Sequence, residues 1–142
     1  MTFAGAGYGA ILGAAVAGWL IGALWYTLLA QPWQAAVGMT SAKMQRAERG
    51  PGFYLPFLYA FVAQVIMAWV LAGLIGHLGP GQFTLRNGVI SGAFCWLGFV
   101  ITTMVVNNTF ARRDPRLLLI DGGHWLVVLL LMGAIVGSFG GR

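Results

Sequence analysis

Four long apolar stretches, separated by short polar breaks, dominate the pattern of the chain. They run over about residues 4–30, 53–77, 87–110 and 116–139. Each is long enough for a helix to cross the hydrocarbon core of a bilayer, which takes about 20 mostly apolar residues. The pattern predicts an all-α membrane protein, a bundle of four transmembrane helices that forms a single domain over residues 1–142.

Residues that start or stop helices occupy the breaks. Gln31-Pro32 follows the first stretch, and glycine-proline-glycine triplets centred on Pro51 and Pro80 flank the second. Asp114-Pro115 precedes the fourth stretch. Aspartate suits a helix N-cap, and proline suits the first turn because its missing N–H would have no partner there. These residues therefore set the ends of the predicted spans.

The break after the first stretch is long enough to contain structure of its own. Thr40 or Ser41 can cap a short helix that ends at Gly50. Its Met44 would touch the membrane while Lys43 reached the headgroups. A solvated turn accounts for the same residues equally well.

Composition supports a membrane location. The chain is 59% hydrophobic and only 8% charged, whereas a soluble domain has about 25% charged residues. The first stretch has no basic leader and no small-residue cleavage site, so it is not expected to be a cleavable signal peptide. The single cysteine, Cys95, lies in an apolar run and is expected to be a buried apolar residue rather than a reactive thiol.

The basic residues predict the direction of the spans. Six of the eight lie in the breaks after the first and third stretches, and loops rich in Lys and Arg remain in the cytoplasm. Both termini are therefore expected on the non-cytoplasmic side. The net charge of +5 reflects this topology, so no nucleic acid partner is expected. The six are Lys43, Arg46, Arg49, Arg112, Arg113 and Arg116, against Arg86 and Arg142 on the other side.

Small residues recur at intervals of four, which places them on shared helix faces. Such faces allow close approach of helices in lipid, either within one bundle or between two copies. The first stretch has two of these faces, so one is expected to meet its own bundle and the other a second copy in a homo-oligomer. The series are Gly5, Gly9, Gly13, Ala17; Ala14, Gly18, Gly22; Gly88, Gly92; and Gly133, Gly137, Gly141.

An acid and an imidazole interrupt the apolar run LLLIDGGHWLVVLLL of the fourth stretch. Asp121 and His124 are three residues apart, so they share a helix face. Gly122 and Gly123 between them would leave room for another backbone or a ligand. At about 1.5 Å per residue, Asp121 lies roughly 9 Å from the start of the helix at Pro115.

Polar side chains from the other stretches should converge at this depth, near the cytoplasmic end. Tyr54 and Tyr59 begin the second stretch there, and Gln64 lies nearer the middle of the membrane. Ionisable residues inside a membrane are candidate functional residues by default. The candidate ligand-binding residues are Trp25, Tyr26, Asn107, Asn108, Asp121 and His124.

A purely structural network accounts for the same residues. Asp121 could pair with Arg112, Arg113 or Arg116, and His124 could bond to Asn108 or a carbonyl. The aromatic residues could be interfacial anchors: Trp25, Tyr26, Trp33 and Trp125. An enzyme is the least supported class, because the spans contain only two acid–base groups, Asp121 and His124, and no clear nucleophile. No metal is expected, since the other histidine, His77, lies at the opposite face of the membrane. No catalytic residue and no cofactor are expected either.

Four segments resemble the DUF1761 family of small bacterial four-helix membrane proteins of unknown function: GALWYTLL, AVGMT, WLGFVITTMVVNNTFARR and LLLIDGGHWLVVLLLMGAIVG. The resemblance covers nearly the whole chain. It matches the tryptophan–tyrosine pair of the family to residues 25–26, its third-helix asparagine to 107 or 108, and its Asp/Asn-Gly-His motif to 121–124. Residues 27–33 depart from the proline and Phe-Gly-Lys turn of the family.

The resemblance implies a multi-pass protein of the bacterial cytoplasmic (inner) membrane and no assigned activity. The polar cluster favours binding or transport of a small molecule, a lipid headgroup or a proton. The alternative is a structural or assembly protein, either a homo-oligomer or an accessory subunit of a larger membrane complex. Beyond these, the expected partner is the lipid bilayer.

Overall fold

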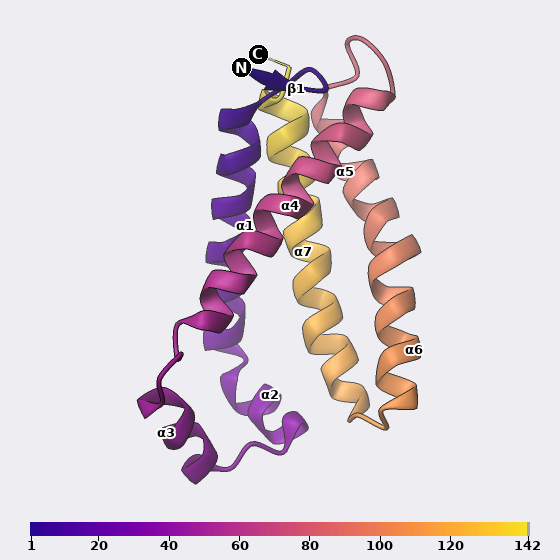
Figure 1. The fold of residues 1–142 in the computed structure, drawn as a ribbon. Helices are drawn as coiled ribbons and strands as arrows, with labels where there is room; N and C mark the ends of the chain where they lie inside the picture. The colour runs from indigo at the N-terminus through magenta and orange to yellow at the C-terminus, as the bar shows by residue number, and fades with distance from the viewer. Residues whose placement is uncertain (142) are drawn as a thin grey trace.

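The computed structural model describes residues 1–141 and confirms the predicted all-α fold. Within these residues, four helices are long and apolar enough to cross a membrane. They are α1 (Tyr8–Leu28), α4 (Leu55–His77), a third span over Leu85–Phe110 and α7 (Pro115–Phe139) (Figure 1). The third span has three consecutive parts: α5 (Leu85–Cys95), the π-helix η1 (Trp96–Ile101) and α6 (Thr102–Phe110).

The first helix begins later than the pattern indicated. Residues before Tyr8 form a hairpin of two short strands, β1 (Thr2–Phe3) and β2 (Ala6–Gly7). Its turn places Gly5 at a φ of 87°, in the left-handed region that glycine tolerates best. The Gly7 N–H donates to the Gly140 carbonyl at 2.8 Å, so both termini lie at one end of the bundle, here called the terminal end (Figure 1).

Two short helices follow α1 at the opposite end. The chain bends at Leu29 into α2 (Ala30–Val37), so Pro32 lies in the first turn of a new helix. The predicted capped helix is α3 (Ser41–Arg49), whose Thr40 cap accepts a hydrogen bond from the Lys43 N–H at 3.4 Å. This end also contains the α6–α7 turn, and we call it the basic end after the six residues Lys43, Arg46, Arg49, Arg112, Arg113 and Arg116.

The α7 helix lies in the middle of the bundle and contacts every other spanning helix (Figure 1). Its closest contact is with α5, where a Cβ on Gly88 would meet the Gly133 carbonyl and a Cβ on Gly92 would meet the Leu129 carbonyl. Gly137 packs in the same way on the Thr84 carbonyl. These two glycine series therefore pack within one chain.

The two small-residue faces of α1 differ. Gly18 packs on α4 and α7, whereas a Cβ on Gly9 or Gly13 would meet nothing within 4 Å. Gly5 lies in the hairpin turn before α1 begins, so it is not part of this helix face. The predicted series Gly5, Gly9, Gly13, Ala17 therefore loses its first member. One face is thus used inside the bundle and one is open.

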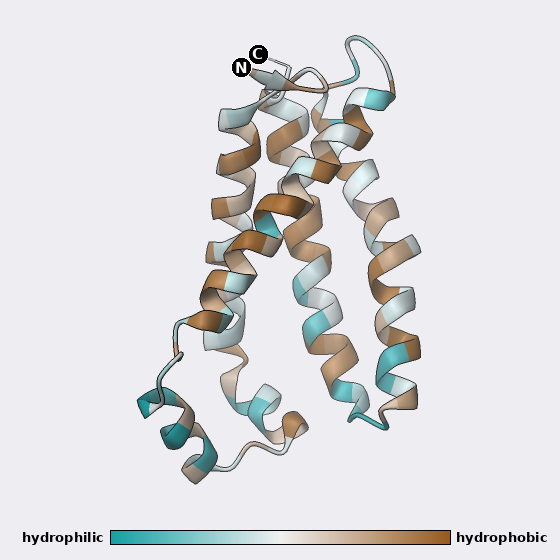
Figure 2. Cartoon of the chain, viewed as in Figure 1, coloured by the Kyte–Doolittle hydropathy of each residue, from teal (hydrophilic) through white to brown (hydrophobic). Residues whose placement is uncertain are grey.

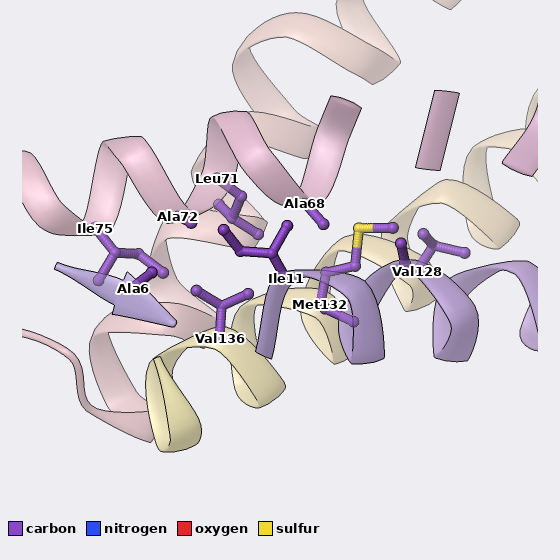
Figure 3. Close-up of a cluster of buried hydrophobic side chains, with 11 residues drawn as sticks. Ala6, Ile11, Ala68, Leu71, Ala72, Ile75, Val128, Met132 and Val136 are labelled. Atoms are coloured by element: carbon purple, nitrogen blue, oxygen red, sulfur yellow. The ribbon is translucent and has the colours of Figure 1, made fainter. Parts of the chain in front are cut away.

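The apolar core lies where α1, α4 and α7 meet, toward the terminal end. Figure 3 shows Ile11, Leu71 and Met132 from these three helices packed together, all 2% exposed or less. Cys95 is partly buried and packs against this core, in line with its predicted apolar role. The outer helix faces are also apolar, and hydrophilic residues gather at the basic end (Figure 2).

Candidate functional site

The Asp121 carboxylate on α7 is the only acidic side chain within the four spans. Its Oδ1 atom accepts two hydrogen bonds, from the Tyr26 hydroxyl at 2.7 Å and from the Trp33 indole Nε1 at 3.1 Å. Trp33 belongs to α2 and reaches Asp121 because the chain bends at Leu29. Two neutral donors therefore fix this carboxylate in position.

Two further indoles bind the backbone beside Asp121. Trp25 Nε1 donates to the Ile120 carbonyl at 3.0 Å, and Trp96 Nε1 donates to the Gly122 carbonyl at 2.8 Å. Indoles from α1, α2 and η1 thus bind three consecutive residues of α7. These bonds tie α7 to three other elements at the depth of the carboxylate, so the site is rigidly supported.

Side chains fill the space over the glycine pair, so the expected room for a second backbone or a ligand is absent there. A Cβ on Gly123 would lie 3.2 Å from the Trp25 ring, and one on Gly122 would lie 2.8 Å from the Ile101 Cδ1. The glycines instead allow an indole and a methyl group to approach α7 closely.

The π-helix explains how two residues of the third span reach one glycine. Trp96 and Ile101 are five residues apart and both contact Gly122. Five residues do not return to the same face of an α-helix, where neighbours are three or four apart. The wider π turn brings both side chains onto α7.

A cavity of about 600 Å³ lies beside Asp121 at the basic end, between α6, α7 and the start of α2. Part of its lining is aromatic or apolar, from Tyr26, Trp33, Met104, Ala111 and Trp125. The rest is polar, from Asn107, Asn108, Arg113 and Asp121. This volume is in the usual range of small-molecule sites, about 300–1,000 Å³.

The structure brings four of the six candidate residues into the cavity wall: Tyr26, Asn107, Asn108 and Asp121. Trp25 supports the backbone behind the wall. His124 also lies behind it, only 4% exposed, with its ring centroid 5.0 Å from that of Tyr26. Tyr26 thus contacts both members of the Asp121–His124 pair.

The His124 ring has no hydrogen-bond partner on either nitrogen within residues 1–141. Its Nε2 lies 3.1 Å from the position of a Cβ on Gly22. One turn along α1, the Gln64 Oε1 from α4 packs against Gly18 and also lacks a donor. The expected bond from His124 to Asn108 or a carbonyl is therefore wrong. An orphaned buried polar group costs about 1–3 kcal/mol.

The arginines of the α6–α7 turn differ from the expected structural pairing. Arg116 binds Asp114 at 2.7 Å, and that bond lowers the pKa of the Asp114 carboxyl. No arginine forms an ion pair with Asp121 in the described chain. Arg113 lines the cavity and its side chain has no carboxylate partner among residues 1–141.

The α4 helix contributes nothing to the cavity wall, contrary to the expected convergence of all four helices. Tyr54 and Tyr59 are 78% and 65% exposed and do not line it. Trp33 and Trp125, which were also candidates for interfacial anchors, both line the cavity. The sequence offered no signal for Trp33, because Pro32 indicated an end to the helix and the contact with Asp121 depends on the bend at Leu29.

The fold and the cavity define a multi-pass helical membrane protein with one polar pocket at the basic end of its bundle. A family model described as a protein of unknown function (DUF1761) matches residues 9–137, nearly the whole chain. The chain belongs to the DUF1761 family, as its motifs indicated. No curated protein and no solved structure matches it.

Proposed function

We propose that this protein binds a small polar molecule in the cavity at the basic end. The observation that carries the proposal is the Asp121 carboxylate, held by Tyr26 and Trp33 at the wall of the cavity without an ion-pair partner in residues 1–141. Burying an unpaired charge is costly. An ionisable group kept inside a membrane protein therefore usually serves a ligand or a transport path.

The supporting structure suits a binding site, because the wall is fixed before any ligand arrives. Tyr26 and Trp33 already orient Oδ1 of Asp121, and two indole hydrogen bonds hold the adjacent backbone. A preformed site avoids the entropic cost of ordering its side chains on binding. The remaining wall residues supply amide and guanidinium donors as well as aromatic surface.

Native mass spectrometry of protein extracted gently from its own membrane tests the proposal. We expect wild type to retain a discrete small molecule and Asp121→Asn to lose it. Tyr59→Phe, on the exposed side of α4, is the matched control and should retain it. Identical adduct masses for wild type and Asp121→Asn would overturn the proposal.

We further propose that the basic end faces the cytoplasm of a bacterial inner membrane, which would place the cavity on that side. Labelling of single cysteines in a Cys95→Ala background tests the orientation. A membrane-impermeant maleimide added to intact cells should label Gln82→Cys near the terminal end and spare Ser41→Cys at the basic end. The reverse pattern would contradict this orientation.

An assembly role is the second candidate, and the open face of α1 favours it. Gly9 and Gly13 have free space at their Cβ positions, so a helix from a second copy could approach closely there. Gly9→Leu should then shift the protein from oligomer to monomer in native mass spectrometry. Gly98→Leu, at another open glycine, is the control and should leave assembly unchanged.

A further inference from the structure

The charges in the cavity wall point to the chemical class of its ligand, an inference that rests on the proposed function. We propose that the cavity binds a zwitterion, with an ammonium group at Asp121 and a phosphate or carboxylate group at Arg113. The wall contains both an unpaired carboxylate and an unpaired guanidinium within residues 1–141.

The carboxylate side suits an ammonium group. Both donors to Asp121 are neutral and both bind Oδ1, while Oδ2 has no donor in residues 1–141 and is not among the buried orphaned atoms. Oδ2 is therefore accessible for a charged hydrogen bond from a ligand.

Aromatic rings strengthen this preference for a cation. Tyr26 and Trp33 form an edge-to-face pair, with centroids 5.9 Å apart and planes at 77°, so they make two perpendicular walls beside the carboxylate. Trp125 adds a third ring to the cavity lining. Aromatic faces attract ammonium groups, most strongly in partly desolvated sites.

The guanidinium side suits an anionic group. Arg113 follows a tight turn in which Arg112 has a φ of 50°, and its own N–H bonds to the Asn108 carbonyl at 3.0 Å. The turn is thus anchored while the side chain is left without a carboxylate partner in the described residues. The Asn107 and Asn108 amides in the wall add neutral donors. A planar guanidinium binds phosphate and carboxylate groups through paired hydrogen bonds.

The two charges together select against simpler ions. Asp121 and Arg113 line one cavity without forming an ion pair, so a molecule placed between them meets both. Arg113 would repel a ligand with only positive charge, and Asp121 would repel one with only negative charge. A zwitterion satisfies both groups at once.

Titration of purified protein in an uncharged maltoside detergent, followed by tryptophan fluorescence, tests this inference. The probes are glycerophosphoethanolamine, ethanolamine and glycerol 3-phosphate. We expect the zwitterion to bind at least about tenfold more tightly than either half, the gain of one charge-assisted contact. Equal affinities for all three probes, or no binding of the zwitterion, would overturn the inference.

Charge-neutralising variants assign each half of the ligand. Asp121→Asn should reduce the affinity for glycerophosphoethanolamine to that for glycerol 3-phosphate, and Arg113→Gln should reduce it to that for ethanolamine. Arg113 is exposed in a turn, so its variant should fold normally. Arg86→Gln removes an exposed charge near the terminal end and should leave the affinity unchanged. A loss in Arg86→Gln equal to that in Arg113→Gln would count against a site at Arg113.

A lipid headgroup and a free solute share this chemistry, and nanodiscs separate them. Retention of phosphatidylethanolamine over phosphatidylglycerol in native mass spectra, lost in Arg113→Gln, would make the ligand a lipid. Binding of the soluble probe without such retention would make it a free zwitterion. If Asp121 controls a retained molecule while no zwitterion binds, this inference fails and the proposed binding function stands.

Discussion

Tyr26 and Asp121 are separated by 95 residues and joined by a 2.7 Å hydrogen bond, from the phenol hydroxyl to the carboxylate Oδ1. The bond links the end of the first span to the start of the last. Both residues line the cavity, so the bond fixes part of its wall. Behind the wall, the tyrosine ring lies against His124. Tyr26 therefore contributes both to the packing between these two spans and to the wall of the cavity.

Tyr26→Phe should destabilise the protein without changing the shape of the wall. Loss of a hydrogen bond to a charged group is expected to reduce the free energy of unfolding by about 1.5–3 kcal/mol. Thermal unfolding in detergent measures it, with Tyr59→Phe as a control on an exposed tyrosine. Equal melting temperatures for the two variants would mean that the Tyr26 hydroxyl contributes nothing to the fold.

His124→Phe should match or exceed wild type in thermal stability. The phenyl ring is only slightly larger than the imidazole, and the substitution removes two buried nitrogens that have no partner in residues 1–141. His124→Ala, which leaves a cavity in the core, should lower the stability by about 2–5 kcal/mol. Equal destabilisation by both substitutions would show that the ring nitrogens are needed for folding.

Gly88→Ala should be strongly destabilising. The new methyl group would meet the Gly133 backbone, so α5 and α7 would have to move apart. Overpacking costs about 1–3 kcal/mol where side chains can adjust, and backbone adjusts less readily. Gly13→Ala adds the same methyl group to open space on α1 and should be neutral or stabilising. Similar unfolding curves for both variants would contradict this packing.

The Asp114–Arg116 pair predicts a weak dependence of stability on acid. Arg116 holds the pKa of the Asp114 carboxyl below its unfolded value. The contribution is therefore present above the unfolded pKa and is lost as pH falls through the folded pKa. The pair is exposed, so the effect should be small. Unfolding curves from pH 6 downward should fall more steeply for wild type than for Asp114→Asn, and parallel curves would exclude this contribution.

Local chemistry explains why the spans could be predicted so closely. In lipid, a chain must satisfy its backbone hydrogen bonds internally, and an apolar stretch of about 20 residues does so as a helix. Proline and cap residues then set the ends. Asp114 caps α7 and Pro115 opens it, as the sequence indicated, and Thr40, one of the two caps that it allowed, caps α3. Each of these signals acts within one turn of the residue that carries it.

The candidate site was predicted only in part, because its assembly depends on residues far apart in sequence. The pattern indicated Tyr26, Asn107, Asn108 and Asp121, since polar groups are rare in apolar helices. It missed Trp33, whose place in the wall depends on a bend at residue 29. It also missed the π turn at 96–101, where two side chains are accommodated over Gly122.

The sequence by itself determined four helices long and apolar enough to span a membrane, most of their ends, and the place of the Asp121–His124 pair along the last of them. The tertiary structure decided which polar groups meet. Tyr26 and Trp33 bind Asp121, while His124 is left against the Gly22 backbone without a partner in residues 1–141. Helix formation follows from local backbone hydrogen bonding in a medium without water. Which polar side chains become hydrogen-bond partners depends on how closely the helices approach. That distance is set by glycines and bends distributed over the whole chain.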